Sequence, residues 1–415
     1  MDFIDIAKNT KEASLKLANT STELRNTALE TVAKALEANK ERLMTANERD
    51  LKVAQEMIKI GELTQAVFNR LKFDENKMNA MIAGVKDLIK LDDPINKCML
   101  AKELDSGLNL YKTSCPIGVL GIIFEARPDV ITQISALAIK SANAVILKGG
   151  KEAINTNKVT FEILTEALNS VEGFPKNVIN QVYSREDVAK MLEMNEYINL
   201  IIPRGGNSLV KFVQENTKIP VLGHADGICH IFIDESADLK MSTNIVIDAK
   251  TQYPSACNAV ETVLFHKNFK YINEVLQSLE CVGVKTISNP DKWDFEYSDK
   301  ILAYKTVENI TEAINHINTY GSGHTDAIVT DNIDNAERFL NEVDSAGVYH
   351  NASTRFSDGY RYGFGAEVGI STNKTHARGP VGLEGLTIYK YKLYGNGQIV
   401  KDYAEGSKKF THKDL

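Results

Sequence analysis

The sequence has little cysteine, and its cysteines are not spaced as disulfides or zinc ligands usually are. The 415 residues contain five, an odd number, widely separated and without a C-x-x-C pair. Disulfide frameworks and thiolate zinc sites both need closely or regularly spaced cysteines. We therefore expect reduced thiols and no metal at Cys98, Cys115, Cys229, Cys257 and Cys281.

Signals for secretion, membranes and nucleic acids are also missing. The first ten residues, MDFIDIAKNT, carry acids where a secretory signal has basic residues followed by an apolar run. No apolar run reaches the roughly 20 residues that cross a bilayer. A net charge of -7 gives no general basic field for a nucleic-acid backbone. We expect a cytoplasmic protein that binds neither membrane nor nucleic acid.

The periodicity present in the chain predicts an α/β fold. Residues 11–55 and 63–89 repeat apolar positions at three and four, which is typical of helices. From residue 118 onward, short apolar strands alternate with amphipathic helices, first to about residue 235 and then in a second series to about 350. This order predicts two domains, each with a mainly parallel sheet covered by helices on both faces. The late stretch GLTIYKYKLYG alternates polar and apolar residues without a following helix, so we expect it to pair with another sheet or subunit.

Cys257 is the strongest candidate for a reactive side chain. It lies in TQYPSACN, a small, polar, proline-broken loop between an expected helix and strand. An exposed thiol in such a loop can be surrounded by backbone N–H donors. The alternative is that it is a small buried residue, as free cysteines usually are. We expect that burial for the other four cysteines.

Three further segments are candidates for binding. GHADGICH contains His224, Cys229 and His230, but the spacing fits no common zinc pattern, and a loop that lines a pocket is the better interpretation. G-x-G-x-x-G is absent, so a dinucleotide would have to bind in another way. Lys148 and the turn Arg204-Gly205-Gly206 both follow expected strands, where open parallel sheets collect ligands, although either could be a solvated turn.

The irregular stretch from 351 to 380 is the last of these segments. It has Arg355 and four other basic residues among many glycines and serines. Such a loop can form an anion pocket, because guanidinium groups bind carboxylate and phosphate bidentately. The alternative, a mobile solvated loop, is weakened by the aromatic residues between the charges.

Several long motifs give the chain a resemblance to a known family. GVLGIIFEARPDVITQ, AVILKGGKEA, IPRGGNSLV, VLGHADGICHIFID and YPSACNAVETVL resemble the γ-glutamyl phosphate reductases, within the aldehyde dehydrogenase superfamily. The resemblance covers nearly the whole chain. It implies reduction of L-glutamyl 5-phosphate to L-glutamate 5-semialdehyde with NADPH, the second step of proline biosynthesis, through a cysteine thioester.

The resemblance also implies a domain layout. Residues 1–105 and 118–235 would form a cofactor-binding domain and 236–379 a catalytic domain. Residues 106–117 and 380–397 would form a strand arm that joins subunits into a homo-oligomer. The resemblance also implies a glutamate 5-kinase as the partner that supplies the acyl phosphate.

Residue roles follow from the same resemblance. Cys257 would be the nucleophile, with its own N–H or the amide of Asn258 stabilising the oxyanion. Lys148 would contact the adenosine ribose and Glu296 the nicotinamide ribose. Arg204, Gly205 and Gly206 would lie beside the cofactor, and the substrate anions would be held by Arg127, His224 and Arg355, with Arg204 a further candidate.

Two departures from the hydrolytic aldehyde dehydrogenases bear on the reaction. Ala126 stands where those enzymes have the oxyanion-hole asparagine, and Gly223 where they have the glutamate that activates water. Without that base, a thioester would survive until it is reduced. A CoA-acylating aldehyde dehydrogenase shares these features, but the cationic loop favours a small dianionic substrate. A non-catalytic binding protein on the same fold is the other alternative.

Overall fold

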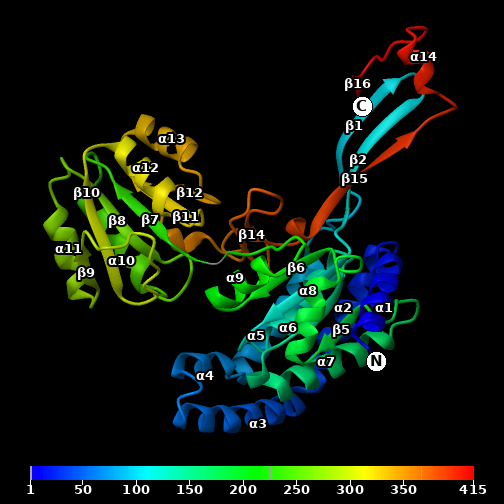
Figure 1. Ribbon diagram of the computed structural model, residues 1–415, viewed down its shortest axis with the longest axis horizontal. Coiled ribbons are helices and arrows are strands. Elements are labelled where there is room, and N and C mark those ends of the chain that lie inside the picture. Colours follow the sequence, from blue (N-terminus) through cyan, green and yellow to red (C-terminus); the bar gives the residue numbers. More distant parts are fainter. Residues whose placement is uncertain (1, 225, 366) are drawn as a thin grey trace. The chain divides into compact units, whose positions relative to one another are not determined.

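The computed structural model describes residues 2–224, 226–365 and 367–415, and the chain divides into two compact units (Figure 1). Unit 1 consists of Met1–Gly205, Phe212–Val221 and Gly382–Leu415. Unit 2 consists of Gly206–Lys211 and Leu222–Val381.

Unit 1 contains a parallel four-stranded sheet in the order β5-β4-β3-β6. All six residues of the central strand β3 are buried, as expected for a strand covered on both faces. Helices join consecutive strands, and the strand order reverses between β3 and β6. The carboxyl ends of these two strands are therefore the switch point where open α/β sheets bind ligands. The elements are β3 (Val119–Phe124), α6 (Val130–Lys140), β4 (Ala144–Lys148), η1 (Lys151–Ala153), α7 (Ile154–Asn169), β5 (Ile179–Val182), α8 (Arg185–Glu193), β6 (Leu200–Arg204) and α9 (Asn207–Glu215).

The helical sequence at the N-terminus forms five helices and begins earlier than the periodicity predicts. The first helix starts at Phe3, and the predicted stretch 11–55 is interrupted twice. One break ends at Ser21, whose hydroxyl accepts the N–H of Leu24 and so caps the next helix. The other is at Asn39. The helices are α1 (Phe3–Leu17), α2 (Thr22–Ala38), α3 (Lys40–Lys59), α4 (Gln65–Leu71) and α5 (Glu75–Lys90).

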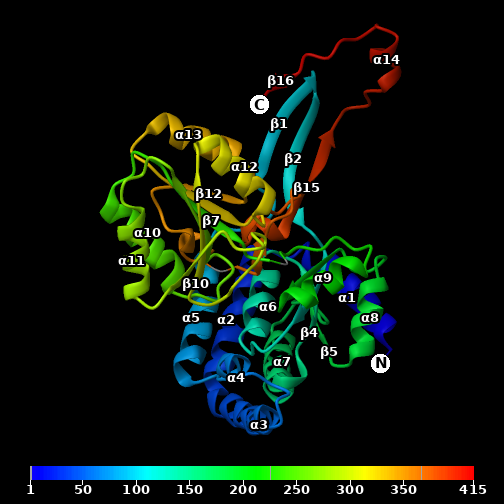
Figure 2. The ribbon, with the colours of Figure 1, turned by 60° about the vertical axis from the view of Figure 1, so that its left-hand side comes forward.

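A second sheet of unit 1 is antiparallel and projects from its helices in both views (Figures 1 and 2). Its order is β15-β2-β1-β16, and β15 pairs with β2 from Thr387 to Tyr394. The expectation that GLTIYKYKLYG pairs with another sheet is thus met within the chain. The domain boundary expected at residue 105 falls inside a hairpin, because β1 pairs with β2 in this sheet. The elements are β1 (Cys98–Asp105), β2 (Leu108–Pro116), η3 (Glu384–Leu386), β15 (Thr387–Tyr394), α14 (Val400–Ala404) and β16 (Lys413–Asp414).

Unit 2 contains a parallel six-stranded sheet in the order β12-β11-β7-β8-β10-β9 and an antiparallel pair, β13-β14. Residues of α10 and α11 pack in one apolar cluster with the strands, and residues of α12 and α13 pack in another. The predicted parallel sheets covered by helices are therefore confirmed. The elements are β7 (Cys229–Ile233), α10 (Leu239–Thr251), β8 (Val260–His266), α11 (Ile272–Cys281), β9 (Lys285–Ser288), β10 (Ile301–Val307), α12 (Ile310–Tyr320), β11 (Thr325–Val329), α13 (Ile333–Glu342), β12 (Gly347–His350), η2 (Thr354–Phe356), β13 (Gly369–Ser371) and β14 (Gly379–Val381).

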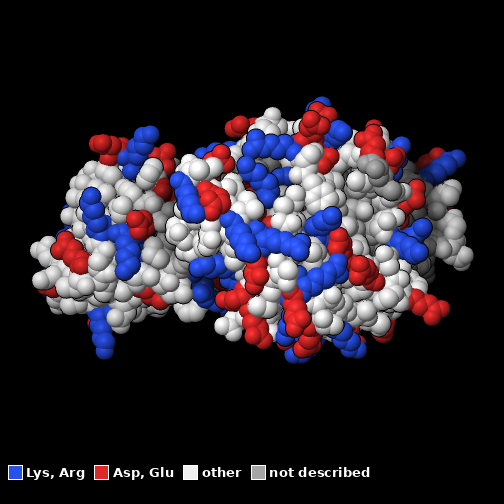
Figure 3. Space-filling model, turned by 90° about the horizontal axis from the view of Figure 1, so that it is seen from below, with Lys and Arg blue, Asp and Glu red and all other residues white. Residues whose placement is uncertain are grey.

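The surface carries charges of both signs. On the face shown in Figure 3, Lys and Arg side chains are interspersed with Asp and Glu. Among the helices of the described residues, none is long and apolar enough to span a membrane.

Candidate active site

Cys257 lies in the loop between α10 and β8, where its side chain is half-buried. Two short backbone turns shape this loop: the N–H of Ala256 donates to Tyr253 O, and that of Ala259 to Ala256 O. Gly227 packs directly against it, since a Cβ at Gly227 would lie 2.4 Å from the Cα of Cys257. A side chain at position 227 would therefore displace the Cys257 backbone.

The neighbouring Asn258 is buried and ties the loop to η2. Its Nδ2 donates to the carbonyl of Ser357 at 2.8 Å, and its own carbonyl accepts the hydroxyl of Thr354 at 2.7 Å. Within the described residues, its Oδ1 has no hydrogen-bond partner. One of the two Nδ2 hydrogens is thus committed to holding the loop, which leaves the other for an oxyanion.

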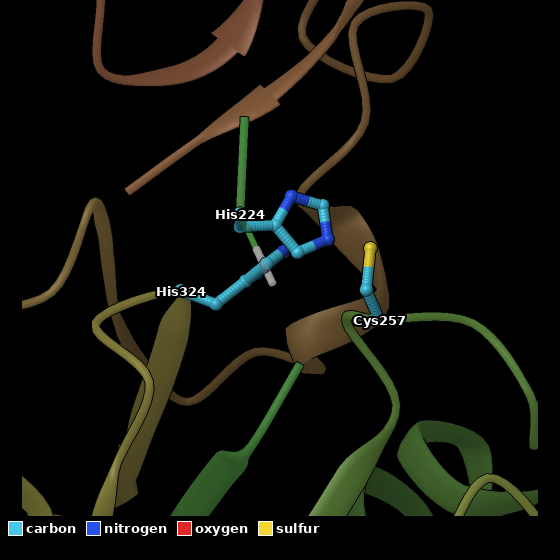
Figure 4. Close-up of side chains that lie close together, drawn as sticks. All are labelled: His224, Cys257 and His324. Atoms are coloured by element: carbon cyan, nitrogen blue, oxygen red, sulfur yellow. The ribbon is translucent and has the colours of Figure 1, made fainter. Parts of the chain in front are cut away.

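Two histidines lie beside Cys257. The donor atoms of His224, Cys257 and His324 all lie within 4.8 Å of one another (Figure 4). Nδ1 of His224 is 2.9 Å from the carbonyl oxygen of Ile370. Because a carbonyl only accepts, Nδ1 carries the proton and the lone pair of the neutral ring is on Nε2. The His224 ring is then both oriented and held in one tautomer.

His324 was missed by the sequence analysis. His324 is the last residue before β11. Gly227 and Cys257 lie likewise in the loops just before β7 and β8. Because β11, β7 and β8 are adjacent parallel strands, the loops before them meet at one edge of the sheet. The sequence GSGHT before a strand was the available signal for His324. It indicates a loop, but only the strand order shows that this loop lies beside Cys257. From the segment GHADGICH, which was expected to line a pocket, His224 is the residue that joins this group.

Arg355 is the predicted anion-binding arginine that shares unit 2 with Cys257. It is 8% exposed, its Nε donates to Gln252 Oε1 at 2.9 Å, and its guanidinium carbon lies 5.9 Å from the centre of the Tyr253 ring. Burial, helped by the charge of Arg361, lowers its pKa, while Cys257 acts in the opposite direction. An arginine remains cationic after such a shift, so a fixed positive charge lies near the thiol.

Glu296 also belongs to unit 2. Its Oε2 accepts the N–H of Gly227 at 3.1 Å and Nδ2 of Asn207 at 3.3 Å. It thus contacts the segment that supports the Cys257 loop.

Three of the remaining candidates, Lys148, Arg204 and Arg127, lie in unit 1 at or after the carboxyl ends of its strands. Lys148 ends β4, Arg204 ends β6, and Arg127 is exposed shortly after β3. Burial lowers the pKa of Lys148, and Glu152 opposes this shift. A Cβ at Gly206 would meet no atom within 4 Å, so the turn before α9 is open to an approaching ligand. Cations and an open turn that follow parallel strands at their carboxyl ends fit the phosphates of a dinucleotide.

The other four cysteines agree only in part with the burial that was expected for them. Cys229 is fully buried, as expected, and burial raises the pKa of its thiol well above the usual value. The prediction of burial is wrong for Cys98 and Cys281, which are exposed, and Cys115 is only half-buried. Apolar periodicity shows that a residue lies in an element, but not which face of the element is covered.

Comparisons with known proteins agree on one family. The aldehyde dehydrogenase family model matches residues 1–292. A γ-glutamyl phosphate reductase of Brachyspira hyodysenteriae is 55% identical over 100% of both chains. The crystal structure of a γ-glutamyl phosphate reductase of Thermotoga maritima superposes with a TM-score of 0.93 at 38% identity, covering 96% of this chain and 100% of that one. An acetylating aldehyde dehydrogenase of Geobacillus thermoglucosidasius, with a TM-score of 0.69 and 15% identity over 96% of this chain and 97% of that one, shares the fold.

Proposed function

Because the chain belongs to the γ-glutamyl phosphate reductase family of the aldehyde dehydrogenases, we propose that it reduces L-glutamyl 5-phosphate to L-glutamate 5-semialdehyde with NADPH and releases phosphate. This is the second step of proline biosynthesis. The observation that carries the proposal is the half-buried Cys257, whose sulfur lies within 4.8 Å of a ring nitrogen of His224 and of one of His324. Gly223 stands where the hydrolytic enzymes have their water-activating glutamate, so a thioester at Cys257 is protected from hydrolysis.

The first chemical step forms a thioester on Cys257. The thiolate attacks the γ-carbonyl carbon, a C–S bond forms, and the C–O bond to phosphate breaks. The negative charge on the carbonyl oxygen is stabilised by the N–H of Cys257 and the remaining Nδ2 hydrogen of Asn258. One such donor contributes about 3–4 kcal/mol in comparable sites. Bound NADPH supplies the hydride that reduces the thioester, and Cys257 leaves as a thiolate when the thiohemiacetal opens.

We assign five residues to the cofactor. Lys148, Arg204, Gly205 and Gly206 hold the adenosine and phosphate part, and Glu296 the nicotinamide ribose. Lys148 and Arg204 suit this role because they stand at the carboxyl ends of parallel strands, where ligands collect.

The substrate carries two anions, a phosphate and an α-carboxylate. We assign their recognition to Arg355, Arg127 and His224, with Arg204 a further candidate for the phosphate. Arg355 is the best placed of the arginines, because its guanidinium is buried and close enough to Cys257 for the two charges to influence each other.

The reverse reaction tests this proposal. Glutamate semialdehyde, inorganic phosphate and NADP are mixed with the protein, and NADPH formation is followed by its absorbance. We expect turnover that requires phosphate and disappears in Cys257→Ser. Cys281→Ser removes an exposed thiol outside the site and serves as the matched control, with turnover unchanged.

Other outcomes identify the alternatives. Turnover without phosphate would mean a hydrolytic dehydrogenase with a base elsewhere. Turnover only with CoA in place of phosphate would support a CoA-acylating enzyme, whose fold this chain shares. No turnover in any assay would leave the non-catalytic binding protein.

The proposed setting is a cytoplasmic homo-oligomer that receives its substrate from a glutamate 5-kinase. The acyl phosphate is labile, so a nearby kinase would shorten its exposure to water. Co-elution of the two enzymes on a sizing column, absent when either is omitted, is the test of a stable complex.

A further inference from the structure

His324 is a buried histidine with an unsatisfied nitrogen. Its side chain is fully buried, and Nδ1 lies 2.9 Å from the hydroxyl oxygen of Thr325. Within the described part of the chain, Nε2 has no hydrogen-bond partner. An unpaired buried polar atom typically costs about 1–3 kcal/mol, so such an atom calls for an explanation. The ring extends towards His224 in Figure 4, with the two ring centres 4.9 Å apart.

The three side chains offer the donor set of a soft divalent metal. A thiolate and two imidazoles are ligands preferred by zinc and copper rather than by magnesium or calcium. The Nδ1–H of His224 already donates to a backbone carbonyl, which is the usual outer contact of a metal-bound histidine and leaves Nε2 as the ligand atom. His324 has its Thr325 contact in the corresponding place.

The spacing requires only a small contraction. Zinc binds sulfur at about 2.3 Å and nitrogen at about 2.0–2.1 Å, which places tetrahedral ligand atoms roughly 3.4–3.6 Å apart. The three donor atoms lie within 4.8 Å of one another without a metal. Movement of the half-buried Cys257 side chain by about an ångström would close the site, with a fourth position left for water.

We propose that His224, Cys257 and His324 bind Zn²⁺ or a similar soft divalent cation, and that the bound ion reversibly blocks the enzyme. The ion takes the sulfur lone pair, so Cys257 can no longer attack an acyl carbon while it is bound. The binding of the metal rests on the geometry of these three residues and does not require the proposed function. The inhibition rests on the proposed function of Cys257.

Cobalt is the probe for binding. The protein is treated with a chelator, freed of it and titrated with CoCl₂, and the near-ultraviolet thiolate-to-cobalt charge-transfer band is recorded. We expect the band in the wild type and in Cys281→Ser, and its loss in Cys257→Ser. His324→Ala should weaken cobalt binding by at least about tenfold. Near-ultraviolet circular dichroism without metal shows whether each variant is folded.

His224→Asn is the second ligand variant, for use if loss of the buried His324 unfolds the chain. It should weaken cobalt binding to a similar extent. A wild type without the band, or a band that persists in Cys257→Ser, would overturn the site.

Inhibition is measured separately in the reverse reaction with ZnSO₄. Turnover should fall as zinc is added and return with excess chelator, and His224→Asn should need at least about ten times more zinc for the same fractional inhibition. A cobalt band without turnover in any assay would contradict the proposed function but leave the metal site. Turnover without the cobalt band would contradict the metal site but leave the proposed function.

Discussion

At the scale of the residue, Arg355 has the structural features of an anion clamp. Its guanidinium is held by Gln252 on one side and lies near the Tyr253 ring, so its orientation is fixed before a substrate arrives. A prepositioned guanidinium binds a carboxylate or phosphate at lower entropic cost than a free surface arginine does.

Replacing Arg355 should therefore affect substrate binding more than chemistry. In Arg355→Ala we expect KM for glutamate semialdehyde to rise at least about tenfold, the equivalent of about 1.4 kcal/mol, with a smaller change in kcat. Arg355→Lys should recover only part of the loss, because an ammonium is not bidentate. Arg338→Ala, at a surface ion pair with Glu342, is the control. An unchanged KM in Arg355→Ala would exclude the clamp role.

At the scale of the element, the sequence predicts the helices and strands well and their spatial neighbours poorly. The polar loop around Cys257 and the alternation of strands with helices are local properties, so both could be predicted. The strand order β11-β7-β8 depends on pairing between residues far apart in the chain. His324 and its closeness to Cys257 follow from that order, and for this reason they could not be predicted.

A buried ion pair joins α10 to β8, the two elements on either side of the Cys257 loop. Lys250 Nζ lies 2.7 Å from Glu261 Oε2, with 0% and 1% of the side chains exposed. Burial raises the pKa of Glu261 from 4.5 to about 7, against the lowering effect of Lys250. Burial likewise lowers the pKa of Lys250. The carboxylate thus depends on its partner to remain charged.

Lys250→Met should destabilise the protein in a pH-dependent way. The pKa of Glu261 is higher in the folded than in the unfolded chain, so its stabilising contribution is present below pH 4.5 and is lost as the pH rises through about 7. Without Lys250 the folded-state pKa rises further. Urea unfolding should show a loss of about 3–5 kcal/mol at alkaline pH and a smaller loss at acidic pH.

The double variant Lys250→Met with Glu261→Leu is the control for this pair. Because no buried charge is left, most of the stability at alkaline pH should return. Equal losses at both pH values would contradict the uncompensated carboxylate as the cause.

At the scale of the whole molecule, the antiparallel sheet of unit 1 has large apolar side chains along β15 that stay exposed among the residues that the structure describes. Tyr389, Tyr391 and Leu393 alternate along β15 and therefore lie on one face, where they are 42%, 60% and 57% exposed. β15 is also an edge strand, so one side of its backbone is open to pairing. Adjacent exposed apolar side chains of this kind are typical of subunit interfaces.

This face should hold the homo-oligomer together. The double variant Tyr391→Asp with Leu393→Asp places two charges on it, and in size-exclusion chromatography with light scattering we expect the variant at the mass of one chain and the wild type at a multiple of it. Lys390→Glu with Lys392→Glu changes two charges on the opposite face of the same strand and should leave the wild-type mass. A wild type with the mass of one chain, or equal masses for the two double variants, would show that this face is not the interface.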